Sequence, residues 1–223
     1  GRRNVVNDFL PVETAAAIAK THEDGKPLLV ADYADNPGAG AYGDATNLLK
    51  AMLDAGVTNA SFSPMIDPNA ANELHRHKVG DTVTLAVGGK SDPRFGGAPL
   101  TLTGQIRLLS DGAFTGDGPI MGGVSHTFGP TVVFRVDGID ILIVTENEQM
   151  LDQQQLRAFG IEPEKKRVLA LKSMQHFRAA FEPIAREVML VDAGGLCSTD
   201  ASRFTYAKLR RPIWPLDPVE EPL

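Results

Sequence analysis

Two short segments concentrate the residue types that could do chemistry, and the first runs from Asp32 to Asp44. It follows an apolar run of strand length, and in open α/β sheets ligands collect where strands end and loops turn into helices. Carboxylates there could orient a ligand or a metal-bound water, and glycines would let the backbone approach another surface closely. A tight structural crossover explains the same residues equally well, so both interpretations stay open. The residues concerned are Asp32, Asp35, Asn36, Gly38, Gly40, Gly43 and Asp44.

The spacing in this segment argues against two common phosphate sites. No Gly-Lys-Ser/Thr follows the glycines, as the lysine-containing phosphate loop requires, and the glycines match a dinucleotide fingerprint poorly. Three carboxylates further disfavour a bare phosphate ligand because like charges repel.

The second segment, from Lys172 to Arg178, stands where a buried strand is expected to lead into a helix. Lys172, Ser173, His176 and Arg178 could together bind an anion or a carboxylate. The alternative is a hydrogen-bonded corner that supports packing. If both segments follow parallel strands, they meet at one edge of the sheet, which is compatible with one site.

The other reactive side chains give weaker indications. There is no His-Glu-x-x-His motif, and His75 and His77 are two residues apart, so on a helix they point to different faces. Cys197 has no histidine near it in sequence, which favours an unreactive thiol over a nucleophile. As the only cysteine, it also excludes an intrachain disulfide and a Cys-rich zinc site.

The composition is that of an ordinary globular chain with an acidic balance. Of 223 residues, 43% are hydrophobic, and 22 Lys and Arg against 28 Asp and Glu give a net charge of −6. This acidity argues against nucleic acid as a partner, and no apolar run approaches the roughly 18 residues that span a bilayer. We therefore expect no nucleic-acid and no membrane partner. The chain begins at Gly1, which leaves open that it is part of a longer protein.

The two ends of the chain are predicted to form parallel strand–helix units. Near the N-terminus we expect a helix over 12–22, a strand over 27–32, a helix capped by Asp44 and ended by Gly56, a strand over 60–66, and a helix from Asp67 to about His77. Toward the C-terminus we expect a helix capped by Asp152, a strand over 168–171, a helix over 174–186, a strand over 187–192, and a proline-rich stretch, 210–217, over the surface.

The middle of the chain has a different pattern. Polar and apolar residues alternate over 82–87 and 100–108, and Asp137-Gly138 is the signal for a tight β-hairpin. The predicted fold class is therefore α/β: a mixed sheet with parallel βα units at both ends of the chain and an antiparallel, β-hairpin-rich insert over about 80–145.

Several blocks of sequence, in order over about 190 residues, point to one family. The segment from Leu28 to Thr46 resembles the stretch aDxaDNPGgGxxGDxT of the MlrC family, the microcystinase C-like metallopeptidases. The match is to the C-terminal domain of that family. The further blocks are Gly129-Pro-Thr131, Lys172 to Phe181, Pro183-Ile-Ala185, Val191-Asp192, Ser198, Asp200, Tyr206 and Arg211 to Asp217.

The resemblance implies a parent zinc peptidase that acts on small or cyclic peptides in a bacterial cytoplasm. A larger N-terminal domain of the family holds the zinc through Asp and His residues, and nothing in this chain matches it. The resemblance thus implies a lead-in with a helix (1–26), a C-terminal-type α/β domain (27–217) and a tail (218–223), with the upstream catalytic domain and the zinc absent. Ala39, Ala41 and Gly194-Gly195 depart from the family pattern and could reshape the loops without removing their acidic and amide groups.

The leading hypothesis is a domain, inactive alone, that packs against the zinc-binding N-terminal domain and completes its cleft for a small peptide substrate. The alternative is a non-catalytic structural or oligomerisation domain, and a homo-oligomer is compatible with both. A self-sufficient hydrolase using Cys197 or Ser173 is the weakest hypothesis. No catalytic residue and no metal ligand is assigned; the cleft or substrate-binding candidates are Asp35, Asn36, Gly38, Gly40, Asp44, Lys172, Ser173, His176 and Arg178.

Overall fold

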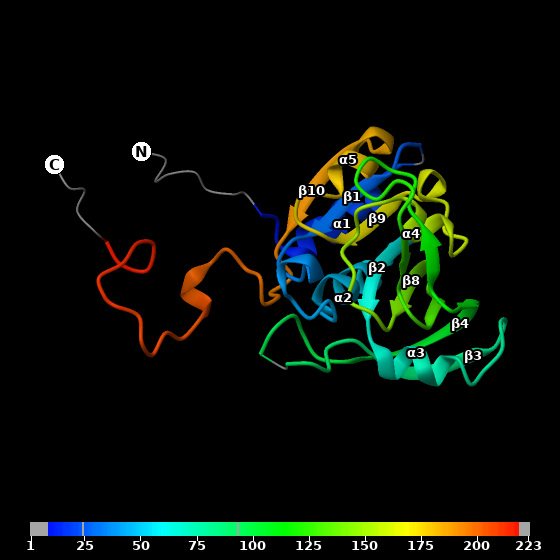
Figure 1. The fold of residues 1–223 in the computed structure, drawn as a ribbon, viewed down its shortest axis with the longest axis horizontal. Helices are drawn as coiled ribbons and strands as arrows, with labels where there is room; N and C mark the ends of the chain where they lie inside the picture. The colour runs from blue at the N-terminus through cyan, green and yellow to red at the C-terminus, as the bar shows by residue number, and fades with distance from the viewer. Residues whose placement is uncertain (1–8, 24, 93, 219–223) are drawn as a thin grey trace.

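The computed structural model describes residues 9–23, 25–92 and 94–218. These residues form ten strands and five α-helices, and the helices lie on the two faces of one large sheet (Figure 1). The strands are β1 (Leu28–Asp32), β2 (Ala60–Ile66), β3 (Thr82–Val87), β4 (Leu100–Ser110), β5 (Ala113–Thr115), β6 (Ser125–Thr127), β7 (Thr131–Val136), β8 (Ile139–Val144), β9 (Val168–Lys172) and β10 (Glu187–Val191). The helices are α1 (Val12–Thr21), α2 (Asn47–Asp54), α3 (Pro68–Leu74), α4 (Gln154–Arg157) and α5 (Arg178–Phe181).

Eight strands make the main sheet, in the order β10-β1-β9-β2-β8-β7-β4-β3. The first five of these are parallel, and β7, β4 and β3 add to them in antiparallel pairs. β1 and β9 are buried along their whole length because both faces of the sheet are covered, and only their last residues, Asp32 and Lys172, are charged. This arrangement confirms the predicted mixed α/β class.

The hairpin around Asp137-Gly138 forms as predicted, with positive φ angles of 46° and 87° at its two turn residues. Its second strand, β8, also pairs in parallel with β2. The hairpin therefore joins the parallel half of the sheet to the antiparallel half, so the middle segment is continuous with the main sheet.

Two apolar cores lie on opposite faces of the sheet. One contains the buried faces of α1, α2 and α3, and the other contains α4, α5 and aromatic side chains from the segment that holds the small β5–β6 hairpin. Phe114, Phe128 and Phe159 pack ring to ring in the second core, with centroids 5.1–6.2 Å apart. The result is a three-layer arrangement that fixes the strand ends in space.

The predicted helix starts are confirmed at α1 and α3 but not at α2 or α4, since Gln153, and not Asp152, stands at the N-cap position of α4. Asp67 caps α3 by accepting the Ala70 N–H at 3.0 Å, as its position before Pro68 predicted. Asp44 does not cap α2, because Thr46 stands at the N-cap position. The prediction for Asp44 was wrong because its carboxylate binds a different loop, described below.

The long helix predicted over 174–186 is also wrong. The chain bends over residues 173–177, forms only the four residues of α5, and continues as a 3₁₀ turn at Glu182–Ile184. Pro183 explains why α5 ends after Phe181, since proline lacks an N–H and its ring clashes with the preceding helical turn.

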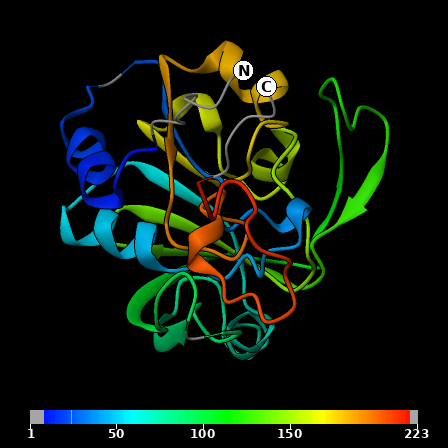
Figure 2. The ribbon, with the colours of Figure 1, turned by 90° about the vertical axis from the view of Figure 1, so that its left-hand side faces the viewer.

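The C-terminal segment, residues 196–218, is named the arm here. It leaves the sheet after β10 and extends away from the body of the molecule (Figures 1 and 2). Every residue from 205 to 215 is exposed, and the proline-rich stretch projects away from the body instead of lying over its surface as expected (Figure 1). Its prolines prevent helix formation. Among the described residues, no helix has the length and apolar character needed to cross a membrane.

Candidate functional site

The carboxyl ends of the parallel strands bring the two polar segments together. In the sheet register Asp32 at the end of β1 pairs with Lys172 at the end of β9, so the loops that follow both strands start side by side. The loop after β1 crosses this edge and places Asp35 against Lys172, with Nζ 2.7 Å from Oδ2. The predicted juxtaposition of the two segments is thus present in the structure.

The Asp35–Lys172 pair is buried and has its hydrogen bonds satisfied. The Lys172 ammonium donates to the Asp35 carboxylate, to the Gly43 carbonyl at 2.7 Å and to the Ala45 carbonyl at 2.9 Å. Asp35 in turn accepts the N–H groups of Gly43 and Ala45. Both side chains are at most 2% exposed. All three ammonium protons are used within the protein, so the pair holds the β1 loop rather than presenting a free cation.

Two more carboxylates bind the loop that follows β3. Asp44 accepts the backbone N–H groups of Lys90 and Ser91, each at 2.8 Å. Asp67 accepts the Gly88 N–H at 2.8 Å and the Lys90 ammonium at 2.7 Å. The loops after β1, β2 and β3 are therefore held to one another by buried and partly buried, charge-assisted hydrogen bonds.

The glycine segment of the β1 loop forms a compact turn. Asn36 Oδ1 accepts the Gly38 N–H, and the Gly40 N–H binds the Pro37 carbonyl while Gly40 adopts φ 93°. A Cβ at Gly38 would lie 2.1 Å from Gln149 Oε1, so a larger residue would force the Gln149 side chain out of its position. These amides donate within the turn and do not point into an open cradle.

Ser173 belongs to the same edge through a residue that the sequence interpretation missed. Its hydroxyl accepts a hydrogen bond from Gln149 Nε2 at 2.8 Å, and it is fully buried. Gln149 thus links the end of β9 to the glycine turn at Gly38. No motif in the sequence marked Gln149, because it lies in an irregular segment far from both partners.

The other two candidates of the second segment lie apart from the ammonium of Lys172. His176 is exposed. Arg178 donates to Gln175 at 2.7 Å and to Glu182 at 3.1 Å along α5. The structure therefore brings together the candidates from Asp35 to Asp44 with Lys172 and Ser173, and leaves His176 and Arg178 on the surface beyond them.

Among the described carboxylates of this edge, Asp32 is the one with a buried oxygen that lacks a hydrogen-bond partner. Its Oδ1 accepts the N–H groups of Ala34 and Ala193, whereas the buried Oδ2 has no hydrogen-bond partner. Burial, together with the nearby Asp35 carboxylate, raises the pKa of Asp32 from 3.8 to about 7. The unpartnered Oδ2 is therefore the atom at which Asp32 binds a proton below its raised pKa.

A second hydrogen-bond network, which the sequence did not predict, surrounds Asp192 just beyond β10. Its carboxylate accepts from the Tyr33 hydroxyl at 2.8 Å, from Ser198 at 3.1 Å and from Arg203 at 2.7 Å. Burial alone would raise the pKa of Asp192, but the hydrogen bonds from Arg203, the Gly194 amide and Tyr33 lower it below its usual value. The network attaches the beginning of the arm to the sheet edge.

A pocket of about 640 Å³ lies between this network and the arm. Aromatic side chains form much of its wall, and Phe9 stacks on Tyr33 with ring centroids 3.9 Å apart. The residues that line it are Phe9, Leu10, Pro11, Tyr33, Asp192, Thr199, Asp200, Arg203, Trp214 and Pro215.

The described residues do not fit a zinc ion by themselves. They contain no group of three or more His, Cys, Asp or Glu placed to hold a metal, whereas a catalytic zinc takes three protein ligands. The carboxylates of the edge instead accept N–H groups and lysine protons, as described for Asp35, Asp44 and Asp67. What this edge can do chemically is to form a rigid wall with backbone and carboxylate groups held in place.

Comparison with known proteins agrees with this architecture. A family model described as the MlrC C-terminus matches residues 30–208. Microcystinase C from a Sphingomonas species is 33% identical over 193 residues, which cover 86% of this chain and 36% of that protein. A crystal structure described as a "Putative metallopeptidase" from Mesorhizobium sp. BNC1 superposes with a TM-score of 0.85 at 26% identity, over 97% of this chain and 42% of that one. The chain thus spans well under half the length of these two relatives.

Proposed function

Because the chain belongs to the MlrC C-terminal family, we propose that it is the C-terminal domain of a zinc metallopeptidase that hydrolyses small or cyclic peptides. In this proposal the zinc ligands lie on another, N-terminal domain of the same protein, and this domain packs against it and completes the cleft. The description of the Mesorhizobium relative as a "Putative metallopeptidase" supports the activity class. Both relatives are more than twice as long as the matched segment, which is consistent with a second domain.

The observation that carries the proposal is the rigid loop cluster at the carboxyl edge. The buried Asp35–Lys172 pair fixes the β1 loop, and Asp44 and Asp67 fix the β3 loop against it. Ligands of open α/β sheets bind at this edge. A pre-organised wall is what a cleft between two domains needs, since little reorganisation is then required when substrate binds.

In this arrangement the buried residues position the loops, and the exposed ones face the substrate. His176 is exposed near the end of β9, and Arg178 is only partly held by Glu182. Both can present donors to a substrate carboxylate or to the oxyanion that forms at a cleaved peptide bond. No step that involves zinc is derived from these residues, because the described ones do not hold it.

The test compares turnover with stability in the longest protein that contains this chain. His176→Ala should lower kcat for a small peptide at least tenfold, which corresponds to a loss of about 1.4 kcal/mol of transition-state stabilisation. It should leave the melting temperature unchanged, because the side chain is exposed. His77→Ala, in the turn after α3, is the matched control and should change neither. Unchanged kinetics for His176→Ala would remove this residue from the cleft.

Metal analysis and peptidase assays separate the domain assignment from the residue assignment. The chain alone should be inactive and bind less than one equivalent of zinc, and the longer protein should bind zinc and cleave peptides. Activity of the isolated chain would contradict the proposal.

A second candidate function is a purely structural domain, and one observation favours it. The hydrogen-bonding groups of Lys172, Asp35 and the Gly38 turn are satisfied inside the protein. If this is their whole role, Lys172→Met will lower stability by about 3 kcal/mol, because it leaves Asp35 buried without its cation. Residual turnover at low temperature would then be normal. Lys166→Met is the control, since Asp140 keeps Arg135 when Lys166 is lost.

A further inference from the structure

The arm carries an exposed apolar surface that the body of the molecule does not cover. Tyr206, Leu209, Ile213 and Trp214 are 37–55% exposed, and their neighbours from 205 to 215 are exposed as well. Single exposed apolar residues are normal, but four within nine residues of a projecting segment mark a surface for association.

The arm is also cationic within an acidic protein. Residues 200–217 contain four Lys and Arg against two Asp, whereas the whole chain has a net charge of −6. Arg211 is paired with Asp217. Lys208 and Arg210 have no ion pair within the part of the chain that the structure describes. Two free cations therefore flank Leu209 on the exposed arm.

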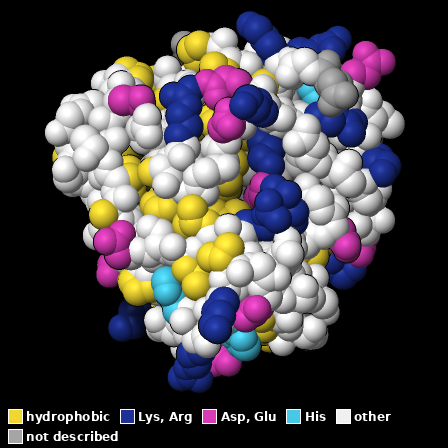
Figure 3. All heavy atoms as spheres, turned by 90° about the vertical axis from the view of Figure 1, so that its right-hand side faces the viewer, with side chains coloured by type: hydrophobic (Ala, Val, Ile, Leu, Met, Phe, Trp, Pro, Cys, Tyr) yellow, Lys and Arg dark blue, Asp and Glu magenta, His cyan; other side chains and the backbone are white. Residues whose placement is uncertain are grey.

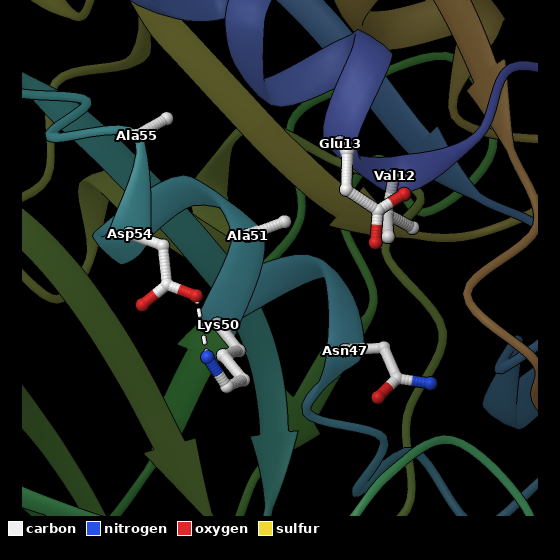
Figure 4. Close-up of a pocket in the computed structure, with 7 residues that line it drawn as sticks. All are labelled: Val12, Glu13, Asn47, Lys50, Ala51, Asp54 and Ala55. Atoms are coloured by element: carbon white, nitrogen blue, oxygen red, sulfur yellow. Dashed lines mark hydrogen bonds and ion pairs between the residues drawn. The ribbon is translucent and has the colours of Figure 1, made fainter.

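A groove of about 530 Å³ between α1 and α2 has the complementary character (Figure 4). Val12, Ala51 and Ala55 give it an apolar floor made of small side chains, and Ala51 and Ala55 point toward α1 in the figure. Glu13 extends from α1 over the groove and has no ion pair among the described residues. Asp54, on the opposite side, is paired with Lys50.

We propose that the arm of one molecule docks in the α1–α2 groove of a second copy, so that two chains exchange arms in a homodimer. Leu209 or a neighbouring apolar side chain occupies the floor formed by Ala51 and Ala55, and Arg210 binds Glu13. The inference is independent of the proposed peptidase function. It rests on the match between an apolar, cationic segment and an apolar groove with a free carboxylate.

The placement of both parts supports exchange between two copies. In Figure 1 the arm extends to the left of the body and α1 and α2 lie in the left part of the body, and Figure 2 shows the two helices to one side of the arm. Two copies that face each other across a twofold axis can therefore each give an arm and receive one, which is the usual geometry of a closed dimer. Figure 3 shows the side away from the arm, where Lys and Arg are interspersed with Asp and Glu around a hydrophobic region. Its mixed charges do not favour a cationic segment over an anionic one.

The single tryptophan makes the proposal directly measurable in the 223-residue chain. Light scattering coupled to size-exclusion chromatography should give a dimer, and sedimentation over a dilution series should give its dissociation constant. Trp214 lies in the arm, so its emission should shift to shorter wavelength as the dimer forms. Higher salt should weaken the dimer because exposed ion pairs are screened.

Charge reversal identifies the two surfaces. Glu13→Arg and Arg210→Glu should each raise the dimer dissociation constant about tenfold or more, because each places like charges together. The double variant, Glu13→Arg with Arg210→Glu, should restore most of the affinity. Glu187→Arg is the matched control, since Glu187 is exposed at the start of β10, at the opposite end of that strand from the arm. Circular dichroism verifies that each variant is folded.

Three results would overturn the proposal. The first is a chain that stays monomeric at every concentration and keeps the Trp214 emission of a solvent-exposed indole. The arm would then bind a different partner, such as the rest of a longer protein. The second is a dimer whose dissociation constant is unchanged by both single charge reversals. The third is a double variant whose dissociation constant stays high when each single variant has raised it.

Discussion

At the scale of single residues, the carboxyl edge contains four buried aspartates in two different states. Asp35, Asp44 and Asp67 each accept N–H groups or lysine protons on their carboxylates. Asp32 uses one oxygen and leaves the other without a partner. A satisfied carboxylate stabilises its loop in the charged form, whereas an unsatisfied one favours the neutral form. The same residue type therefore supports the fold at three positions and opposes it, when charged, at the fourth.

The raised pKa of Asp32 predicts a specific dependence of stability on pH. Between its unfolded value of 3.8 and its folded value of about 7, the folded state binds more protons than the unfolded state. The free energy of unfolding therefore falls as pH rises through this range and stays level above it. Asn cannot ionise, so Asp32→Asn removes this loss. Between pH 5 and pH 8 the free energy of unfolding of the variant should therefore rise by on the order of 2 kcal/mol relative to that of the original protein.

Urea unfolding at pH 5, 6, 7 and 8 measures this difference. Asp111→Asn, at an exposed turn between β4 and β5, is the control for loss of a carboxylate without burial. A difference between Asp32→Asn and the original protein that is constant over the four pH values would show that Asp32 is charged in the fold.

At the scale of elements, the sequence predicts what depends on near neighbours and fails where distant loops meet. The cap of Asp67 on Ala70 and the hairpin at Asp137-Gly138 are local signals, and both are confirmed. Asp44 looked like the same kind of cap, but its partner lies 46 residues away at Lys90. Nothing near Asp44 in the sequence distinguishes the two cases, because a carboxylate takes whichever N–H groups the tertiary structure brings to it.

The candidate site follows the same rule. The meeting of the segments at Asp35 and Lys172 was predictable, because parallel strands end at one edge whatever the distance along the chain. The occupation of every Lys172 proton was not predictable, since it depends on the exact path of the β1 loop past Gly43 and Ala45. Gln149 and Asp192 were missed for the same reason, because their partners come from other elements.

Asp67 connects two elements, which predicts separable effects of two substitutions. Its Oδ1 caps α3, and its Oδ2 holds Gly88 and Lys90 of the loop after β3. Asp67→Ala removes both functions and should cost about 3 kcal/mol. Asp67→Asn can keep the cap, but its amide nitrogen then faces two donors, so it should cost less and still release the loop.

Amide hydrogen exchange distinguishes the two functions of Asp67. The Gly88 amide should lose protection in both variants, whereas the Ala70 amide should lose it only in Asp67→Ala. Asp81→Asn is the control, because Asp81 accepts the Lys78 N–H in a turn just before β3 and does not contact this loop. Unchanged exchange at Gly88 in Asp67→Ala would mean that other contacts hold the β3 loop.

At the scale of the whole molecule, the sheet and the arm contribute very differently to stability. The sheet has apolar cores on both faces, which supply most of the free energy of folding. The first part of the arm, through Arg203, is attached to the sheet by the hydrogen bonds to Asp192. The remainder, from 205 onward, is exposed and adds little to the monomer.

Two truncations should therefore differ sharply, although they remove neighbouring segments. A chain that ends after Phe204 keeps Ser198 and Arg203 on Asp192, so in dilute solution its melting temperature should stay within about 2 °C of the full chain. A chain that ends after Gly195 loses both donors and leaves the partly buried Asp192 with Tyr33 and the Gly194 amide alone. It should lose about 2–3 kcal/mol, because a charged group then lacks its cation. Thermal melts followed by circular dichroism measure both, and equal melting temperatures for the two truncated chains would show that the Asp192 network does not stabilise the sheet.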